Sequence, residues 1–501
     1  MQGAAGFRTP SRNAGRWGRG EMFLGLDIGT SAVKGLVWDG ARVLGAASAP
    51  LKVQVPVPGA SEQDPEAWWR GILAVCAELS AQPGWAEVSA IGLSGQMHGA
   101  VCLGPDGAVL RPAILWNDNR AVREAAEMAA LPGLAARVGV PPMPGFPAPK
   151  LAWLARTEPE LHAATTMVMQ AKDWVGMRLH GRAVTEYSEA AGTLWLDQAA
   201  RDWDREALAF SGLERAQMPA LGAGTDLAGP LSAAAAAALG LKPGVPVIRG
   251  GGDAMVGAAG IGVVAPGQAM ISLGTSGQYL VASEAHRPNP AGLVHSFAHC
   301  VPGAYIQMAA MLNGAAPMAW LAGVLGRSVP DLLAAAETAD PAHVPLFLPY
   351  LTGERTPHGD PEARAGFEGL SHGSGPGEMM RAVVDAIAYS FADAQAVLGE
   401  AGVRAASPLA IGGGARSDLV LQTLADVLEV PVQRPASADL GPALGAAKLA
   451  AVGSGAMPAA RLADPPEIGA VFHPRPSARH GARLARYRAL YSELRGVCAR
   501  P

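Results

Sequence analysis

A Gly-Thr-Ser turn occurs twice in this chain, about half a chain apart, and it constrains the fold more than any other feature. Residues 26–31 (LDIGTS) and residues 272–276 (SLGTS) each follow a short apolar run typical of a β-strand. The separation is too long for a solenoid repeat, but it suits two domains that open with the same hairpin. The sequence therefore predicts an α/β protein with two related domains.

Both turns have the composition of a phosphate-binding loop. Glycine lets the backbone approach an anion closely, and successive N–H groups in such a turn form an anion-binding nest. The residues predicted to bind ATP in the first turn and the strand after it are Thr30, Ser31 and Lys34, and those in the second turn are Gly274, Thr275 and Ser276. Asp27 in the first turn corresponds to Ser272 in the second, so only the first turn has a carboxylate suited to Mg²⁺.

Two more glycine runs follow predicted strands. Gly250, Gly251 and Gly252 directly precede Asp253, which places a carboxylate behind a flexible turn. A later run opens a predicted helix after a short apolar strand, which is a second seat for an anion or nucleotide. The residues predicted to bind ATP there are Gly413, Gly414 and Ser417.

Two polar turns behind apolar strands are candidates for substrate contact, because α/β folds place ligands beyond strand ends. One follows the strand at 88–94 and contains Gln96, Met97 and His98; a lone histidine is otherwise often structural. The other follows the strand at 112–116. There Trp116, Asn117 and Asp118 are equally typical of an ordinary turn or of a polyol site.

These loops fit phosphoryl transfer, which needs in-line positioning, a metal on the phosphates and a base for the attacking hydroxyl. We expect Asp253 to be that base and Asp27 to hold Mg²⁺ directly or through water. The chain has no GxxxxGK[ST], so it is not a P-loop enzyme. It also has no GxGxxG with an acidic residue about 20 positions on, which disfavours a Rossmann dehydrogenase.

Length and charge narrow the class further. A chain of 501 residues predicts two or three domains, which we place at 22–246 and 247–496, with the catalytic Asp on the C-terminal side. With 39 basic and 43 acidic residues it shows no nucleic-acid or membrane signature. No CxxC pair joins its four cysteines, so we expect reduced thiols in a cytoplasmic protein. A homodimer is a possible assembly.

Residues 1–21 carry four arginines and no apolar segment, which excludes a secretory signal. We expect a disordered extension, or a start assigned too early with Met22 as the true start; a transit peptide is the alternative.

From Met22 to about Arg495 the chain resembles the FGGY family of carbohydrate kinases. The Gln-Met-His-Gly turn is similar to that of the members acting on D-xylulose. The segments that carry the resemblance are LGLDIGTSAVK (24–34), SEQDPEAWW (61–69), GLSGQMHGA (92–100), RPAILWNDNR (111–120), MPGFPAPKL (143–151), SEAAGTLWLD (188–197), GGGDAMVGAAG (250–260), ISLGTSG (271–277), FLPYLTGERTPH (347–358), IGGGARSD (411–418) and GPALGAAKLA (441–450).

The resemblance implies two actin-like (ribonuclease-H-like) ATPase domains around a central cleft. It also implies Mg²⁺- and ATP-dependent phosphorylation of D-xylulose at O5, with Asp253 as the base and with Met97 and His98 on the sugar. One departure concerns Ala254, where relatives often have Asn after the catalytic Asp. A sister kinase for another ketopentose or polyol is therefore one alternative, and an actin-like ATPase without a sugar acceptor is a second.

Overall fold

The computed structural model describes residues 21–437, 441–475 and 478–495. The expectation for residues 1–20 and the cysteine Cys498 lie outside this described part. Within it, no helix has both the length and the hydrophobicity needed to cross a membrane.

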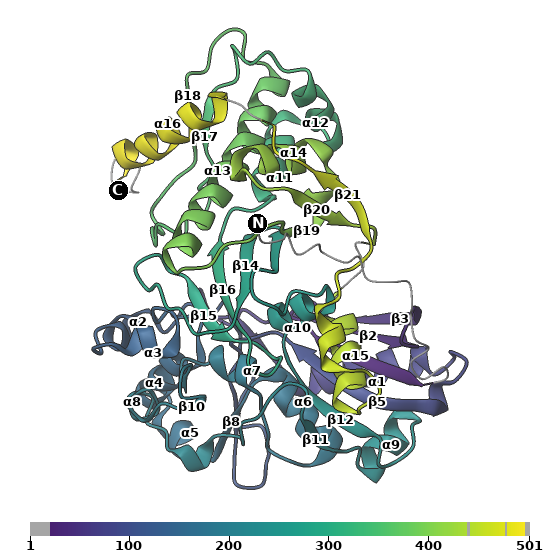
Figure 1. Ribbon diagram of the computed structural model, residues 1–501. Coiled ribbons are helices and arrows are strands. Elements are labelled where there is room, and N and C mark those ends of the chain that lie inside the picture. Colours follow the sequence, from purple (N-terminus) through teal and green to yellow (C-terminus); the bar gives the residue numbers. More distant parts are fainter. Residues whose placement is uncertain (1–20, 438–440, 476–477, 496–501) are drawn as a thin grey trace, which may run out of the picture.

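The first sheet lies in the lower half of Figure 1 and has six strands in the order β11-β12-β5-β1-β2-β3. β1, β5 and β12 run parallel, whereas β2, β3 and β11 pair antiparallel with their neighbours. The strands are β1 (Met22–Ile28), β2 (Ala32–Trp38), β3 (Val43–Pro50), β5 (Val88–Gly95), β11 (Leu227–Pro230) and β12 (Pro246–Gly252).

The second sheet, in the upper half of Figure 1, has the order β15-β16-β14-β13-β19-β20-β21. β13, β19 and β20 run parallel and the other pairs are antiparallel. The strands are β13 (Ala269–Leu273), β14 (Gly277–Ser283), β15 (His295–Ala298), β16 (Tyr305–Met311), β19 (Leu409–Ile411), β20 (Val432–Pro435) and β21 (Ile468–Phe472).

The two sheets correspond strand for strand, with β15 as an additional edge strand. The hairpin β1–β2 matches β13–β14, and each is joined in parallel to the strand that follows its helices, β5 or β19. Asp27 and Ser272 each lie one pair before the end of their hairpin. The predicted duplication of the opening hairpin is confirmed.

The expected boundary between residues 246 and 247 needs correction. β12 begins at Pro246 and pairs with both β5 and β11, so it is part of the first sheet. Asp253, which follows β12 directly, therefore belongs to the first half of the molecule and not to the second. A turn followed by an apolar strand at 242–248 is compatible with the start of a new domain. The sheet partner of a strand, however, cannot be read from the residues of that strand.

Helices α10 and α15 pack against each other and against the first sheet (Figure 1). α15, from the second half, packs on β1 and β5 of the first sheet. A Cβ on Gly25 or Gly92 would lie 1.9 Å from a backbone oxygen of α15, so only glycine allows this approach. α10 and α15 touch through Gly260 and Gly445, where a Cβ on Gly260 would lie 3.1 Å from the Cα of Gly445.

The remaining elements cover the sheets or carry loops at their edges. The helices are α1 (Pro65–Leu79), α2 (Val122–Ala129), α3 (Leu134–Val138), α4 (Pro147–Thr157), α5 (Pro159–Ala164), α6 (Ala171–His180), α7 (Tyr187–Ala191), α8 (Arg205–Phe210), α9 (Ala233–Leu239), α10 (Asp253–Gly260), α11 (Ala316–Leu325), α12 (Val329–Glu337), α13 (Pro376–Glu400), α14 (Asp418–Leu428), α15 (Pro442–Gly453) and α16 (Ala478–Leu494). The short strands are β4 (Glu62–Gln63), β6 (Val101–Leu103), β7 (Ala113–Ile114), β8 (Met167–Met169), β9 (Leu196–Asp197), β10 (Asp202–Trp203), β17 (Leu346–Leu348) and β18 (Gly366–Glu368).

Candidate active site

The C-terminal ends of β1, β5 and β12 bring three predicted site segments to one edge of the first sheet. Asp27 pairs in register with Ser94 of β5, and Ser94 pairs with Gly251 of β12. The turn containing Met97 and His98 follows β5, and Asp253 follows β12. Parallel strands of α/β sheets place ligands at this edge, so these residues form the candidate centre.

Asp253 is the first residue of α10 and is partly buried. Its Oδ1 accepts a hydrogen bond from the backbone N–H of Ala254 at 2.8 Å. Burial, together with the negative charge of Asp27, raises the pKa of Asp253 to about 7. A carboxylate with a pKa near neutrality is well matched to general base catalysis.

The glycines before Asp253 allow the chain to pass close to the turn after β5. Gly250 has a φ of +76°, and a Cβ there would lie 1.6 Å from the carbonyl oxygen of Leu93. A Cβ on Gly252 would lie 2.6 Å from the Sδ of Met97. The glycine run therefore brings Met97 into contact with the backbone that precedes Asp253.

Asp27 is buried at the end of β1, and its Oδ1 accepts a hydrogen bond from Ser94 Oγ at 2.9 Å. Burial raises the pKa of Asp27. The described residues contain no cluster of three or more His, Cys, Asp or Glu that could hold a metal by themselves. Mg²⁺ is often bound by one or two carboxylates plus substrate phosphates, so Asp27 fits an ion that arrives with a nucleotide.

His98 is held by hydrogen bonds of its backbone N–H and its Nδ1, which leaves Nε2 available for a ligand. Its φ is +67°, its N–H donates to Gln170 Oε1 at 2.6 Å, and its Nδ1 lies 2.6 Å from the carbonyl oxygen of Gly192. A carbonyl only accepts, so Nδ1 carries the proton and Nε2 is an acceptor. Burial lowers the pKa of His98 to about 4, which keeps the ring neutral near pH 7.

Trp116 lies beside the first Gly-Thr-Ser turn. Its side chain is 45% exposed, and its Nε1 donates to Thr30 Oγ1 at 3.0 Å. Thr30 Oγ1 in turn donates to Gln96 Oε1 at 2.8 Å. Asn117, the next residue, is exposed. Thr30 thus joins the two polar turns through its hydroxyl, so only its backbone remains for a phosphate.

Two of the predicted substrate contacts are structural, and these predictions are corrected. Asp118 is 1% exposed, and its carboxylate accepts from the N–H of Ser61 and from the guanidinium of Arg120. The Gln96 amide is buried and is taken up by Thr30 and by Gln63. Both side chains stabilise the turns through hydrogen bonds inside the protein, so their polar atoms are already paired.

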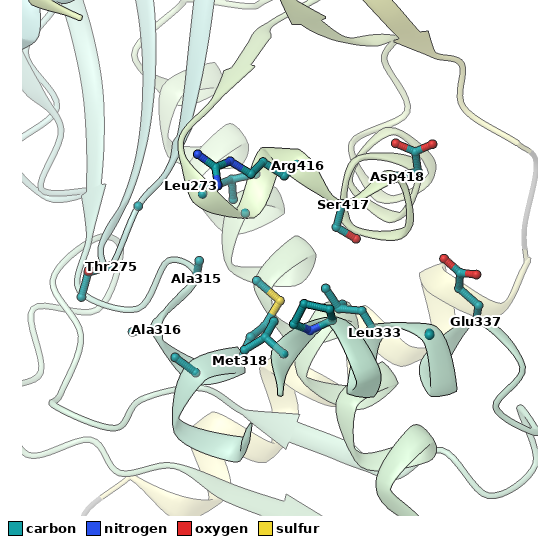
Figure 2. A pocket seen from close by; sticks show the side chains of 17 residues that line it. Leu273, Thr275, Ala315, Ala316, Met318, Leu333, Glu337, Arg416, Ser417 and Asp418 are labelled. Atoms are coloured by element: carbon teal, nitrogen blue, oxygen red, sulfur yellow. The ribbon is translucent and has the colours of Figure 1, made fainter. Parts of the chain in front are cut away.

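The second half contains a cavity of about 880 Å³ between β13, α11, α12 and α14. In Figure 2, Met318, Leu333 and Glu337 lie on the lower side, and Ser417 and Asp418 lie on the upper side. The predicted ATP-binding residues that line it are Gly274, Thr275, Gly413, Gly414 and Ser417. Ser417 also caps α14, because its Oγ accepts from the N–H of Val420. The volume of this cavity is in the range of small-molecule binding sites.

The other predicted ATP-binding residues lie elsewhere. Ser276 is exposed and does not line this cavity. Thr30, Ser31 and Lys34 belong to the first sheet, and Lys34 is exposed on a separate opening of about 520 Å³ beside α15. An ATP contact by these four residues remains a prediction, because it would require the phosphates to reach across from the cavity.

Sequence reasoning missed two groups of residues around these sites. The first is the wall of the cavity from α11 and α12, whose small and apolar residues resemble an ordinary core face. The second is Lys150 of α4, which is 1% exposed and whose Nζ donates to carbonyl oxygens below both polar turns. Burial lowers the pKa of Lys150 to about 7. Its only sequence signal was its place in the motif at 143–151.

Comparison with known proteins gives the family. Residues 22–260 match the N-terminal domain of the FGGY family of carbohydrate kinases, and residues 269–454 match its C-terminal domain. The chain belongs to the FGGY family of carbohydrate kinases. As an FGGY kinase it has the actin-like ATPase fold, as expected. The first match includes β12 and α10, in agreement with the sheet topology.

This FGGY kinase is similar to several proteins of known name. It is 44% identical to the xylulose kinase of Escherichia coli over 86% of this chain and 90% of that protein. It is 42% identical, with the same shares covered, to the xylulose kinase of Klebsiella pneumoniae. A solved "xyloylose kinase" from Brucella ovis superposes with a TM-score of 0.92 and 40% identity, covering 95% of this chain and 100% of that one.

Proposed function

We propose that this FGGY kinase transfers the γ-phosphoryl group of ATP to D-xylulose, giving D-xylulose 5-phosphate and ADP, with Asp253 as the general base. The observation that carries the proposal is the packing of the Met97–His98 turn against the backbone before Asp253, in a chain that is 44% identical to a xylulose kinase. Mg²⁺ is the proposed metal, and Asp27 is its proposed ligand.

The sugar is proposed to bind between the two polar turns. His98 is neutral, and its Nε2 has a free lone pair, so it accepts a hydrogen bond from a sugar hydroxyl. Trp116 offers an exposed ring on the other turn, against which the apolar face of a sugar packs. Asn117 is exposed beside it and can exchange hydrogen bonds with a hydroxyl. Met97 is proposed to line the base of this sugar site, where it packs against Gly252.

In the reaction Asp253 takes the proton from the sugar O5 hydroxyl while that oxygen bonds to the γ-phosphorus. The bond from the γ-phosphorus to the bridging oxygen breaks, and ADP leaves with its electron pair. When bound, Mg²⁺ supplies positive charge that offsets the charge developing on the phosphate oxygens. The 880 Å³ cavity is proposed to take the nucleoside, with Gly274, Thr275 and Gly413 near the phosphates.

The test is ADP release with Mg·ATP and a panel of acceptors: D-xylulose, D-ribulose, L-ribulose, xylitol, D-arabitol, glycerol and D-gluconate. D-gluconate is included because a gluconate kinase from Lactobacillus acidophilus superposes with a TM-score of 0.87 at 26% identity. We expect a clear preference for D-xylulose, which would also show that Ala254 is tolerated. A preference for another acceptor would keep the mechanism and change the substrate. ADP release that no acceptor stimulates would contradict the kinase proposal altogether.

A further inference from the structure

Lys150 joins the two polar turns at the point where their backbones separate. Ala100 and Ile114 form an isolated antiparallel bridge, with N–H to oxygen distances of 3.0 and 3.1 Å in the two directions. Beyond this bridge the chain diverges toward His98 on one side and toward Trp116 on the other. The Lys150 ammonium lies there, 2.7 Å from the carbonyl oxygen of His98.

When protonated, the Lys150 amine is fully used by these contacts. It also lies 2.6 Å from the carbonyl oxygen of Leu115 and 3.4 Å from that of Ile114. An ammonium has three donors, and each has a backbone acceptor. In the described part of the chain Lys150 forms no ion pair with an acid. Burying a cation without a carboxylate is costly, whereas methionine would fill the same volume without that cost.

Lys150 belongs to α4, which has anchors outside the two turns in addition to the contact of Phe146 with the His98 ring. α4 is anchored by the N–H of Ala148, which donates to the carbonyl oxygen of Thr193 at 3.1 Å. Ser211 Oγ donates to the carbonyl oxygen of Ala148 at 3.0 Å. α4 therefore holds Lys150 from the scaffold side, and Lys150 Nζ links the two turns through the carbonyl oxygens of His98 and Leu115.

We propose that Lys150 is a positioning residue for the sugar acceptor, which fixes the spacing between the His98 ring and the Trp116 ring without touching the sugar. This inference rests on the proposed function of the two turns. It assigns to the ammonium a role in acceptor binding that is separate from nucleotide binding, because the nucleotide cavity lies in the second half of the molecule.

The test compares K150M with K448M as a matched control. Lys448 of α15 also donates its Nζ to a backbone carbonyl, that of Gly260 at 2.7 Å, which lies at the end of α10 opposite Asp253. We expect K150M to raise the KM for the preferred acceptor about 10- to 100-fold, because small misplacements of binding groups have effects of this size. The KM for ATP should change less than twofold, and K448M should leave both KM values unchanged.

Three results would overturn the proposal: an unchanged acceptor KM in K150M, an equal rise in K448M, or an equal rise in the KM for ATP. Should K150M fail to fold, K150Q keeps two N–H donors and carries the same readouts, with a smaller expected rise. The acceptor is the one that wild type prefers in the panel above. A failure of the D-xylulose proposal is therefore seen in wild type, before any variant is measured.

Discussion

Asp253 is the residue on which the proposed chemistry depends. D253N keeps the size and the N-terminal position in α10 but cannot accept a proton. We expect kcat to fall about 10²- to 10⁴-fold, the usual contribution of a general base, while ATP still binds. Steady-state ADP release and a nucleotide-binding titration together test this. Turnover near that of wild type would remove Asp253 from the proposed role.

The pH dependence of the reaction provides a second test at the same residue. The base must be ionised, and burial next to Asp27 places the pKa of Asp253 at about 7. We expect kcat/KM to rise about tenfold per pH unit below pH 7 and to level off above it. The residual activity of D253N should lack this rise. A profile that is flat from pH 5.5 to 8.5 in wild type would contradict the assignment.

The same pKa has a consequence for stability. Because the folded-state pKa of Asp253 lies above its unfolded value of 3.8, folding retains a proton between pH 3.8 and about 7, and stability is lost as the pH rises through that range. D253N avoids this loss. We expect its Tm to exceed that of wild type by roughly 1–3 °C at pH 8, and by less at pH 5. Thermal unfolding at the two pH values measures it, and a lower Tm for D253N at pH 8 would contradict the pKa shift.

Residue-level prediction from the sequence worked where a local pattern defines the environment. Three glycines after an apolar strand place Asp253 at a strand end, wherever the rest of the chain goes. The prediction that Asp118 and Gln96 contact the substrate failed because both side chains are hydrogen-bonded inside the protein. Their partners, which include Ser61 and Gln63, come from distant segments of the chain. Lys150 was missed because a lysine in a helix ordinarily faces water.

At the scale of elements, the contact of α15 with the first sheet depends on missing side chains. Gly92→Ala would place a methyl 1.9 Å from the carbonyl oxygen of Ala446, a backbone atom that cannot move aside without shifting the helix. We expect a loss of about 1–3 kcal/mol in the free energy of unfolding. Gly323→Ala is the control, because its site on α11 is open and alanine favours helix by up to about 1 kcal/mol. Chemical denaturation of both variants decides; equal stability would contradict the close-packing argument.

Element boundaries illustrate what local sequence cannot give. The opening hairpins followed from the two Gly-Thr-Ser turns and the apolar runs before them. The sheet to which β12 belongs could not be predicted in this way, because it is decided by pairing with β5. That strand lies about 150 residues earlier in the chain. Whether an apolar strand closes one sheet or opens the next is settled by its partner.

At the scale of the whole molecule, Asp253 and the cavity proposed to take the nucleoside belong to different halves. Transfer requires the γ-phosphate and the acceptor to meet, so we expect the halves to close when both substrates bind. D253N with Mg·ATP and D-xylulose should show a smaller radius of gyration by small-angle scattering than D253N alone. Using this variant prevents turnover during the measurement. Profiles that superpose with and without both substrates would count against closure.

The crossing of α15 onto the first sheet also affects how the protein is made. The apolar face formed by β1 and β5 cannot be covered until residues 442–453 have been synthesised, long after Gly260. At about 5–20 residues per second the ribosome leaves this face open for roughly 10–40 s. We therefore expect that the two halves do not fold independently, although each matches its own family domain. Nascent chains that stop near residue 260 are expected to need a chaperone, and the halves expressed separately are expected to recover solubility only when mixed.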